Sequence, residues 1–223
     1  MAKYLTFDCY DTLIQYSASK RACIHALVSR NAEGIDPEIV VKRQAELEKK
    51  LHLGPFRPLN EVLHISLKQA FEGHGLGHEA EYDQLFENSV RFAPSFHETN
   101  MVLNELAKHF KLVIVSNSEP EIINDNVAVI GAPIYKAITA GEAKCYKPDL
   151  RLFRNVLEQI GCEVSDLIHI GSSFYHDIEP CAKLGWQRVW INRNGQAGNK
   201  AHAPYTELTD LCGLPGFLNV KSR

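Results

Sequence analysis

The sequence predicts an α/β fold in which a doubly wound parallel sheet forms the core and an all-helical segment is inserted after the first strand. Two observations lead to this prediction. From about residue 94 onward, short aliphatic runs alternate with helical periodicity, which is typical of buried parallel strands joined by helices. Before that point, residues 15–92 show apolar side chains at helical spacing with no strand pattern between them.

The first strand is expected at Tyr4–Phe7, a short run of apolar residues and β-formers. The helical segment after it is expected to hold about four helices. One of them starts at Asp36-Pro37, because an N-cap aspartate followed by proline suits the first turn of a helix. We therefore predict two domains, an α/β catalytic core of residues 1–14 and 93–223 and a helical cap of residues 15–92.

The second half of the chain supplies the remaining elements of the core. Its periodicity predicts, in order, helix Thr99–Phe110, strand Leu112–Val115, a helix from Pro120, strand Ile134–Thr139, helix Asp149–Ile160, strand Leu167–Ile170, helix Asp177–Leu184 and strand Arg188–Ile191. Gly161 and Gly185 follow two of these helices, at the position where glycine adopts a left-handed conformation without strain. The tail from Asn194 onward receives no assignment.

Composition and charge narrow the classes of function. The chain has 223 residues with 24 basic and 27 acidic side chains, a net charge of −3, so it lacks the basic excess of a nucleic-acid-binding surface. No window approaches the ~20 apolar residues of a membrane helix, and the N-terminus has no signal-peptide pattern. Six scattered cysteines without a CxxC pair fit reduced thiols. We expect a cytoplasmic protein without nucleic-acid or membrane partners.

Polar side chains follow several predicted strands at their carboxyl ends. Ligands of open α/β sheets bind outside these ends, so the polar groups there are expected to converge on one crevice. They are Asp8, Ser116, Asn117, Ser172, Ser173 and Asp177, together with Lys147 in the loop after another strand.

Asp8 is the residue whose chemistry is clearest. A carboxylate at a strand end is a competent nucleophile when a cation holds it ionised and a donor orients it. Thr12, four residues later, can donate from the turn, and Lys147 can supply the positive charge. A single aspartate after a strand commonly serves as a helix cap or turn former, and the combination with the other groups favours catalysis. His169, inside a strand, is expected to be a hydrogen-bonded core residue.

Four runs of the sequence resemble, in order, the four motifs of the haloacid dehalogenase superfamily. They are FDCYDTLI at 7–14, VIVSNS at 113–118, AKCYKPD at 143–149 and HIGSSFYHD at 169–177. The resemblance implies a flavodoxin- or Rossmann-like core with a cap inserted after the first strand, which agrees with the helical segment found from periodicity. It also implies a hydrolase that uses Asp8 as its nucleophile.

Two positions in these motifs separate the branches of that superfamily. Its phosphatases carry a general-acid aspartate two residues after the nucleophile, and here that position is Tyr10, with Asp11 one residue later. They also carry an acidic residue after the fourth-motif glycine, which helps to hold magnesium, and here it is Ser172. A magnesium site needs several hard oxygen ligands. The resemblance therefore favours the 2-haloacid dehalogenase branch, which needs no cofactor.

Within that branch, the resemblance implies a role for each matching residue. Asp8 displaces halide from a 2-haloacid to give an aspartyl ester, which water hydrolyses to a 2-hydroxy acid. Lys147 pairs with Asp8, Asp177 helps to position the water, and Ser116 and Asn117 contact the substrate carboxylate or the departing halide. The residues expected in catalysis are Asp8, Lys147, Asp177, Thr12 and Ser173, and those expected in substrate binding are Tyr10, Arg43, Ser116, Asn117 and Phe174.

The cap is expected to add a cation for the substrate carboxylate or halide. The run KRQAELE resembles the cap segment of the dehalogenases, which gives this role to Arg43, with Arg57 as the rival. A mixed-charge helix face is commonly just solvated, so an exposed arginine is the simpler interpretation of Arg43. Asp11 in place of glycine, and Phe174 in place of asparagine, depart from the known 2-haloacid enzymes and imply a different leaving group or substrate.

Two other hypotheses stay open at this point. A magnesium-dependent phosphatase would need Asp11 or His176 to replace the missing acid, and magnesium would then be its cofactor. A non-enzymatic binding module would have kept the fold, although it has no need of an intact Asp8 and Lys147. The expected partner is a small carboxylic acid, and the resemblance to cap-bearing enzymes also allows a homodimer.

Overall fold

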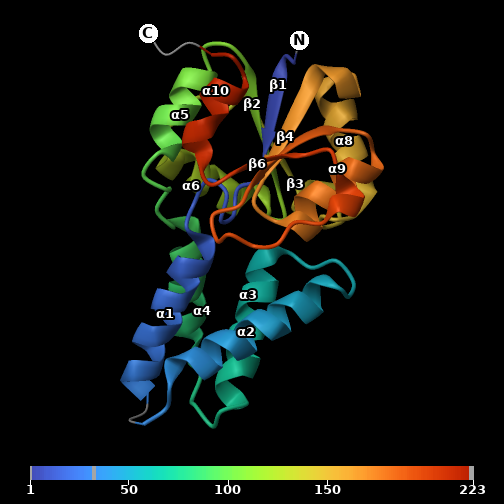
Figure 1. The fold of residues 1–223 in the computed structure, drawn as a ribbon. Coiled ribbons are helices and arrows are strands. Elements are labelled where there is room, and N and C mark those ends of the chain that lie inside the picture. The colour runs from blue at the N-terminus through green and yellow to red at the C-terminus, as the bar shows by residue number, and fades with distance from the viewer. Residues whose placement is uncertain (1, 32–33, 221–223) are drawn as a thin grey trace.

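The computed structural model describes residues 2–31 and 34–220, and these residues form a parallel sheet with helices on both faces and a helical lobe at one end (Figure 1). The six strands of this sheet lie in the order β3-β2-β1-β4-β5-β6, and every pair is parallel. They are β1 (Tyr4–Phe7), β2 (Lys111–Ser116), β3 (Lys136–Thr139), β4 (Leu167–Gly171), β5 (Gln187–Ile191) and β6 (Thr206–Leu208). The predicted doubly wound α/β fold is confirmed.

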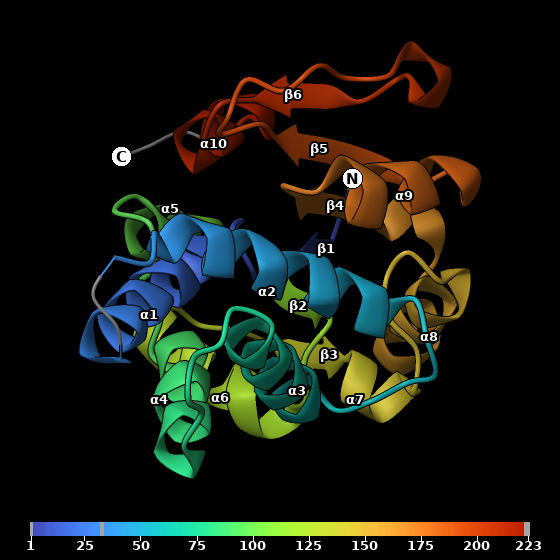
Figure 2. The same cartoon turned by 90° about the horizontal axis from the view of Figure 1, so that it is seen from below.

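Helices cover the sheet on both sides because its central strands are aliphatic on both faces (Figure 2). One hydrophobic cluster joins one face to α5, α6 and α10, and another joins the opposite face to α8 and α9. These helices, with the short α7 after β3, are α5 (Thr99–Leu106), α6 (Pro120–Ile130), α7 (Ala140–Ala143), α8 (Leu150–Ile160), α9 (Glu179–Lys183) and α10 (Leu214–Phe217).

The register of the central strands brings their carboxyl ends to one edge. Phe7, the last residue of β1, lies opposite Ile114 of β2 and Ile170 of β4. Asp8 therefore leaves the sheet between the ends of two neighbouring strands. This is the edge at which the sequence placed the crevice.

The helical lobe lies beyond this edge of the sheet (Figure 1). Its helices are α1 (Tyr16–Asn31), α2 (Pro37–His52), α3 (Leu59–Glu72) and α4 (Ala80–Arg91). The carboxylate of Asp36 accepts a hydrogen bond from the backbone N–H of Glu38, so α2 begins as its Asp-Pro signal predicts. Among the described residues, no helix is long and apolar enough to cross a membrane.

Two crossing segments connect the lobe to the sheet. The backbone N–H of Gln15 donates to the carbonyl of Pro94 at 2.9 Å, so the two segments pair where they cross. The guanidinium of Arg193 then donates to the carbonyl of Thr12 at 2.8 Å and lies 2.7 Å from the carboxylate of Glu98. One arginine from the C-terminal part of the chain thus ties both segments together.

The structure differs from the sequence-based expectation after β4. A helix was expected to start at Asp177, but the chain first forms a π turn, Phe174–Ile178, before α9 begins at Glu179. The side chain of Ser173 accepts from the backbone N–H of His176, and its carbonyl accepts from the N–H of Ile178. These bonds from one serine widen the first turn, and such turns are frequent at functional sites.

Candidate active site

Asp8 is held from two sides. Its backbone N–H donates to the carbonyl of Ile170 at 2.9 Å, which ties the residue to β4. The hydroxyl of Thr12 donates to Oδ2 of Asp8 at 2.7 Å, and the same hydroxyl accepts from the backbone N–H of Ser172 at 2.9 Å. Because the Ser172 N–H is a donor, the proton of Thr12 is directed to Asp8. The predicted Thr12 contact is therefore present in the structure.

Lys147 places a single ammonium group between two carboxylates. Its Nζ lies 2.6 Å from Oδ1 of Asp8 and 2.7 Å from Oδ1 of Asp177. The three side chains are buried, with exposed fractions of 2% for Lys147, 6% for Asp8 and 0% for Asp177. Bonds of this length between ionised groups are strong, and they fix both carboxylates relative to the lysine. Two residues that the sequence placed in the crevice thus share one cation.

The charges in this triad follow from burial and from the neighbouring groups. Burial raises the pKa of Asp8 to about 6, the charge of Asp177 adds to this effect, and Lys147 opposes it. At Asp177 burial acts in the same direction, but Lys147 and His169 outweigh it and hold its pKa below the usual range. Burial lowers the pKa of Lys147, but the two neighbouring carboxylates outweigh this effect and raise that pKa above its usual value. At pH 7, Asp8 is an ionised, oriented carboxylate, as a nucleophile requires.

Ser116 ends β2 and Asn117 follows it, and the two side chains differ in their hydrogen bonds. Asn117 forms two hydrogen bonds with the backbone of Lys147, accepting from its N–H at 2.6 Å and donating to its carbonyl at 3.1 Å. The hydroxyl of Ser116 is fully buried and has no hydrogen-bond partner within the described part of the chain. Asn117 therefore holds the lysine loop, whereas Ser116 has an unused donor.

Gly171 and Ser173 hold Asp177 at the end of β4. A methyl group on Gly171 would lie 2.5 Å from the carboxyl carbon of Asp177, so only glycine leaves room for this side chain. The backbone N–H of Ser173 donates to Oδ2 of Asp177 at 3.1 Å. The hydroxyl of Ser173 is bonded to Nδ1 of His176 at 2.9 Å. Ser173 thus serves Asp177 through its backbone.

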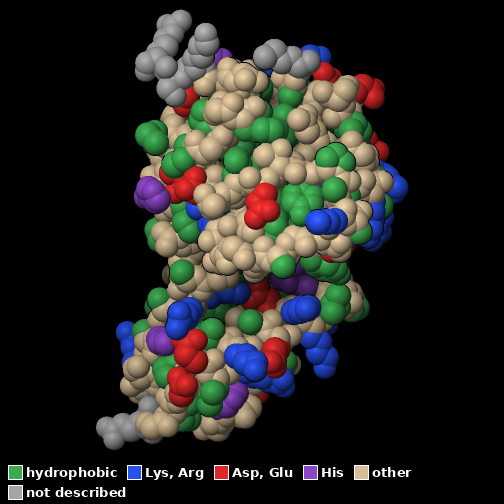
Figure 3. Space-filling view, in the orientation of Figure 1, with side chains coloured by type: hydrophobic (Ala, Val, Ile, Leu, Met, Phe, Trp, Pro, Cys, Tyr) green, Lys and Arg blue, Asp and Glu red, His purple; other side chains and the backbone are tan. Residues whose placement is uncertain are grey.

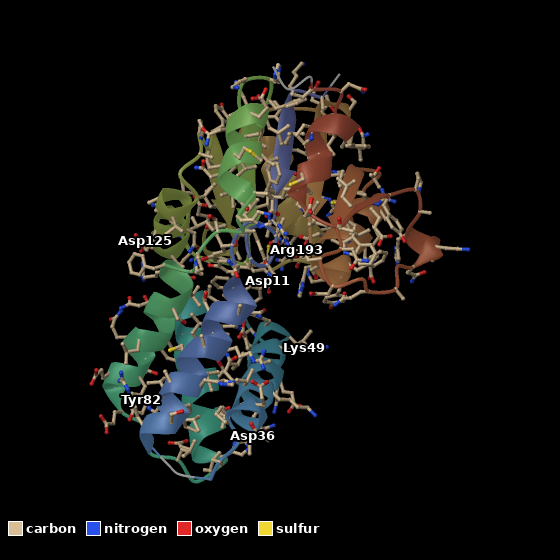
Figure 4. The ribbon with its side chains drawn as sticks, turned by 60° about the vertical axis from the view of Figure 1, so that its left-hand side comes forward. Asp11, Asp36, Lys49, Tyr82, Asp125 and Arg193 are labelled. Atoms are coloured by element: carbon tan, nitrogen blue, oxygen red, sulfur yellow. The ribbon has the colours of Figure 1, made fainter. Side chains whose placement is uncertain are left out.

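Tyr10 stands where the phosphatases carry their acid, and its phenol is already engaged. Its hydroxyl donates to Oγ of Ser118 at 2.9 Å, and its ring stacks on Tyr16 of α1 with centroids 4.2 Å apart. Burial raises the pKa of Tyr10 well above its usual value, so the phenol stays protonated. Asp11 is bonded to the backbone and hydroxyl of Ser17 at the start of α1, where the lobe meets the sheet (Figure 4). Asp11 thus acts as a helix cap.

The lobe is docked to the loops that follow β2 and β3. The carboxylate of Glu119, just after the Ser-Asn-Ser motif, accepts from the backbone N–H groups of Leu59 and Asn60 at 2.7 and 2.9 Å. It therefore caps α3, whose own N-cap residue offers no side-chain bond. Tyr146, the neighbour of Lys147, is hydrogen-bonded to the backbone N–H and carbonyl of Arg57. One residue inside the third motif and one just after the second thus anchor the lobe.

A cavity of about 450 Å³ lies at this junction. On the opposite face of the molecule, Lys, Arg, Asp and Glu side chains gather where the lobe meets the core (Figure 3). Phe56 and Asn60 of the lobe and Glu119 and Gly141 of the core are among the cavity's lining residues. Asp8 does not line it, so this cavity is a gap beside α3 and not the catalytic crevice.

The two arginines proposed for the cap cation both pair with glutamates of the lobe. Arg43 is exposed on α2, with its guanidinium 3.6 Å from Glu46, and its role toward the substrate stays a prediction. Arg57 pairs with Glu61 at 2.6 Å. Lys20 of α1 is instead a buried lobe cation, 8% exposed, and it lies 4.2 Å from the ring centre of Tyr16.

Phe174 lies outside the triad. Its ring meets Trp190 and Tyr205 edge to face, with centroids 5.0 and 5.4 Å apart, and His202 lies 5.9 Å away. The indole of Trp190 donates to the carbonyl of Ser172 at 3.0 Å. In this structure, these rings pack beside the loop of the fourth motif, and Trp190 is hydrogen-bonded to it.

The superfamily's phosphatases imply a magnesium ion at this edge, and the side chains here do not fit one. Among the described residues, no three His, Cys, Asp or Glu side chains are arranged to hold a metal ion. Both carboxylates of the triad are bonded to Lys147, and Ser172 stands at the position where the phosphatases supply a further carboxylate. The donor set is that of two carboxylates paired with one ammonium group.

Several residues of the site were not assigned from the sequence. Tyr146 lies inside the third motif and Glu119 follows the second, but their role depends on the lobe's backbone, which no sequence pattern reveals. Gly171 could have been identified from the sequence, because a glycine inside a buried strand indicates that another group packs closely against its backbone. The buried Lys20 pairs with Glu48, and the two lie on different helices. Only the packing of α1 on α2 brings them together.

Comparisons with known proteins agree with this arrangement. A family model described as haloacid dehalogenase-like hydrolase matches residues 2–185. The chain is 23% identical over 219 residues to (S)-2-haloacid dehalogenase 1 from Pseudomonas sp. (strain CBS-3), covering 95% of this chain and 94% of the relative. It is 22% identical over 125 residues to N-acylneuraminate-9-phosphatase from Mus musculus, covering 54% of this chain. That alignment spans only half (50%) of the phosphatase.

The fold matches solved structures over its whole length. The L-2-haloacid dehalogenase from Xanthobacter autotrophicus with chloropropionic acid covalently bound superposes with a TM-score of 0.85 at 16% identity, covering 100% of both chains. At this identity the likeness shows the fold alone. The family match covers most of the chain and includes all four motifs, and so the protein belongs to the haloacid dehalogenase-like hydrolase family.

Proposed function

We propose that this protein hydrolyses a small 2-haloacid to the corresponding 2-hydroxy acid through an ester on Asp8. The observation that carries the proposal is the pairing of an oriented, buried carboxylate with a protonated tyrosine in the acid position. Thr12 and Lys147 hold Asp8 for attack. The phenol of Tyr10 is committed to Ser118. Displacement of halide needs no proton on the leaving group, whereas the leaving oxygen of a phosphate ester benefits from one.

In the first step, an oxygen of Asp8 attacks C2 of the haloacid. A carbon–oxygen bond forms as the carbon–halogen bond breaks, and halide departs with its electron pair. Ser116, whose buried hydroxyl has an unused donor, is assigned to the substrate carboxylate. Asn117 contributes indirectly, because its side chain holds the backbone of Lys147.

In the second step, water attacks Cγ of the ester while one of its protons passes to Asp177. The bond from Cγ to the alkyl oxygen then breaks, and the departing oxygen takes that proton to form the 2-hydroxy acid. Asp8 is left as a carboxylic acid containing one oxygen from water. Its proton is lost to solvent at neutral pH, because the pKa of Asp8 is about 6. Every group in this cycle belongs to the chain, so the reaction needs no cofactor.

The proposed setting follows from the free thiols. Cys9, Cys23, Cys145, Cys162, Cys181 and Cys212 are all unpaired, which suits the reducing cytoplasm. The proposed partner is a small carboxylic acid. A homodimer stays a prediction.

Halide release from chloro-, bromo- and fluoroacetate and from both enantiomers of 2-chloropropionate tests the proposal. Wild-type protein is assayed with and without EDTA beside the variant Asp8→Asn. We expect halide release that survives EDTA and is lost in the variant. Repeated turnover in heavy-oxygen water should label the peptide that contains Asp8, because water attacks Cγ in the second step.

Two results would contradict the proposal. The first is no halide release with magnesium-dependent turnover of phosphate esters, which would move the chain to the phosphatase branch. The second is unlabelled Asp8 during active turnover, because water would then attack the substrate carbon directly.

A further inference from the structure

His169 is a buried histidine in contact with the triad, and the proposed reaction does not use it. It lies on β4 with an exposed fraction of 0%. Its Nε2 lies 3.3 Å from Oδ1 of Asp177, and its Nδ1 lies 2.8 Å from the hydroxyl of Thr6 on β1. Both ring nitrogens therefore have a partner, as predicted for a hydrogen-bonded core histidine, and one of the partners is an active-site carboxylate.

The direction of these bonds follows from the charges. Asp177 is ionised and can only accept, so Nε2 of His169 carries the proton. Burial lowers the pKa of His169, so the ring is neutral at pH 7 and Nδ1 is a bare acceptor. The hydroxyl of Thr6 then donates to Nδ1. The chain of donors runs from Thr6 through His169 to Asp177.

The ring is also fixed by packing. Phe153 and Trp186 meet it edge to face, with centroids 5.6 and 6.3 Å from that of His169. Both aromatic residues are buried in the cluster that joins the sheet to α8 and α9. These ring contacts and the bond to Thr6 thus hold the donor of His169 toward Asp177.

We propose that His169 is a positioning residue that acts through Asp177 on hydrolysis of the aspartyl ester. The inference rests on the proposed function and concerns its second step. Asp8 has its own donors, Thr12 and Lys147, for the first step. Without His169, Asp177 keeps its hydrogen bonds to Lys147 and to the backbone N–H of Ser173. It loses the one donor that comes from β4.

The consequence is an unequal effect on the two steps. Outer partners that orient a functional group typically change its activity by about 10- to 100-fold when they are removed, as at metal sites. Such a loss at Asp177 slows attack of water on the ester more than it slows formation of the ester. The ester should then accumulate on the protein during turnover.

The experiment compares His169→Phe, which keeps the aromatic packing and removes the donor, with His169→Gln, whose amide nitrogen can reach the position of Nε2. Protein mixed with bromoacetate is quenched in acid at intervals, and the mass of the Asp8 peptide is recorded beside the halide released. His109→Phe is the matched control at an exposed site.

For His169→Phe, we expect a burst of about one halide per protein, a steady rate about 10- to 100-fold below wild type, and accumulated ester. His169→Gln should recover most of the steady rate. If His169→Phe does not fold, His169→Asn takes its place, because its shorter amide does not reach Asp177, and the same contrast with His169→Gln is expected.

The inference is overturned if the variants without a donor hydrolyse the ester at the wild-type rate. It is also overturned if the burst and the steady rate fall together without accumulated ester. Failure of the proposed function is a separate result, because wild-type protein would then release no halide and form no ester.

Discussion

Asn117 and Lys147 exchange two hydrogen bonds across 30 residues of sequence, through the side chain of the first and the backbone of the second. This relationship fixes the loop after β3 against the end of β2. The ammonium group of Lys147 reaches the carboxylates because its backbone is held in this place. The asparagine thus positions the charge that the proposed reaction uses.

Replacing Asn117 by alanine should therefore lower kcat by about 10- to 100-fold, a loss typical of an orienting partner, with a smaller change in KM. Steady-state kinetics with bromoacetate measures both constants, and Asn104→Ala on α5 serves as the control. If KM rises alone, Asn117 binds substrate directly, as the family resemblance implied.

Asn117 was expected to contact substrate and instead holds the backbone of Lys147, which shows how much of the site could be predicted from the sequence. Strand ends in a parallel sheet meet at one edge, so the gathering of Asp8, Lys147 and Asp177 followed from local patterns alone. The partner of Asn117 is a backbone in a distant loop, and no side-chain pattern marks it. The family resemblance favoured direct contact between Asn117 and substrate, because a motif compares side chains and does not show which backbone groups they bind.

The helical lobe shows the same limit. Its helices followed from apolar spacing, but the orientation of Arg43 depends on how α2 is rotated against its neighbours. The run KRQAELE contains charges on several sides of the helix, and the side that is buried carries Glu48. The edge strand β6 was not predicted because it has three residues and pairs only with β5. Such a strand is too short for a periodic signal.

The pH dependence follows from Asp8. Only the carboxylate attacks, and its pKa is raised to about 6, so kcat/KM should fall as the pH drops below about 6 and reach about one tenth of its plateau at pH 5. Halide release from bromoacetate between pH 4.5 and 8 measures the profile, with circular dichroism at each pH to check folding. A plateau that continues below pH 5 would show that the folded protein keeps Asp8 ionised more strongly than burial allows.

Replacing Lys147 by methionine removes the cation that lowers the pKa of Asp8. We expect kcat/KM to fall by about 100-fold or more, as on loss of a preorganised charge, and the acidic limb of the residual activity to move above pH 6. Lys147→Arg should not restore activity, because a planar guanidinium cannot replace a compact ammonium between two carboxylates. Lys108→Met, at an exposed site, is the control. An unchanged acidic limb would show that Lys147 does not set the charge of Asp8.

Glu119 links the lobe to the core through the start of α3. Glu119→Ala should lower the free energy of unfolding by about 1 kcal/mol, the usual effect of losing a helix cap, and raise KM because the lobe docks less firmly. Urea unfolding and steady-state kinetics measure the two effects, with the exposed Glu121→Ala as the matched control. Lower stability with an unchanged KM would limit Glu119 to a structural role.

Gly171 leaves room for the side chain of Asp177, because a methyl group there would lie 2.5 Å from its carboxyl carbon and 2.6 Å from its β-carbon. The backbone of Gly171 does not have a positive φ, so alanine is excluded by this contact alone. Asp177 would have to move, and the buried cluster around it resists such movement. Gly171→Ala should therefore lower the free energy of unfolding by about 1 to 3 kcal/mol, as overpacking does.

The same change should slow ester hydrolysis, since a displaced Asp177 no longer meets Lys147 and His169 together. Thermal unfolding and the mass of the Asp8 peptide during turnover measure the two effects. Gly54→Ala is the control, because its added methyl group makes only an ordinary contact, 3.4 Å from a carbonyl oxygen. If Gly171→Ala loses stability but hydrolyses the ester at the wild-type rate, the position of Asp177 is not what limits the second step.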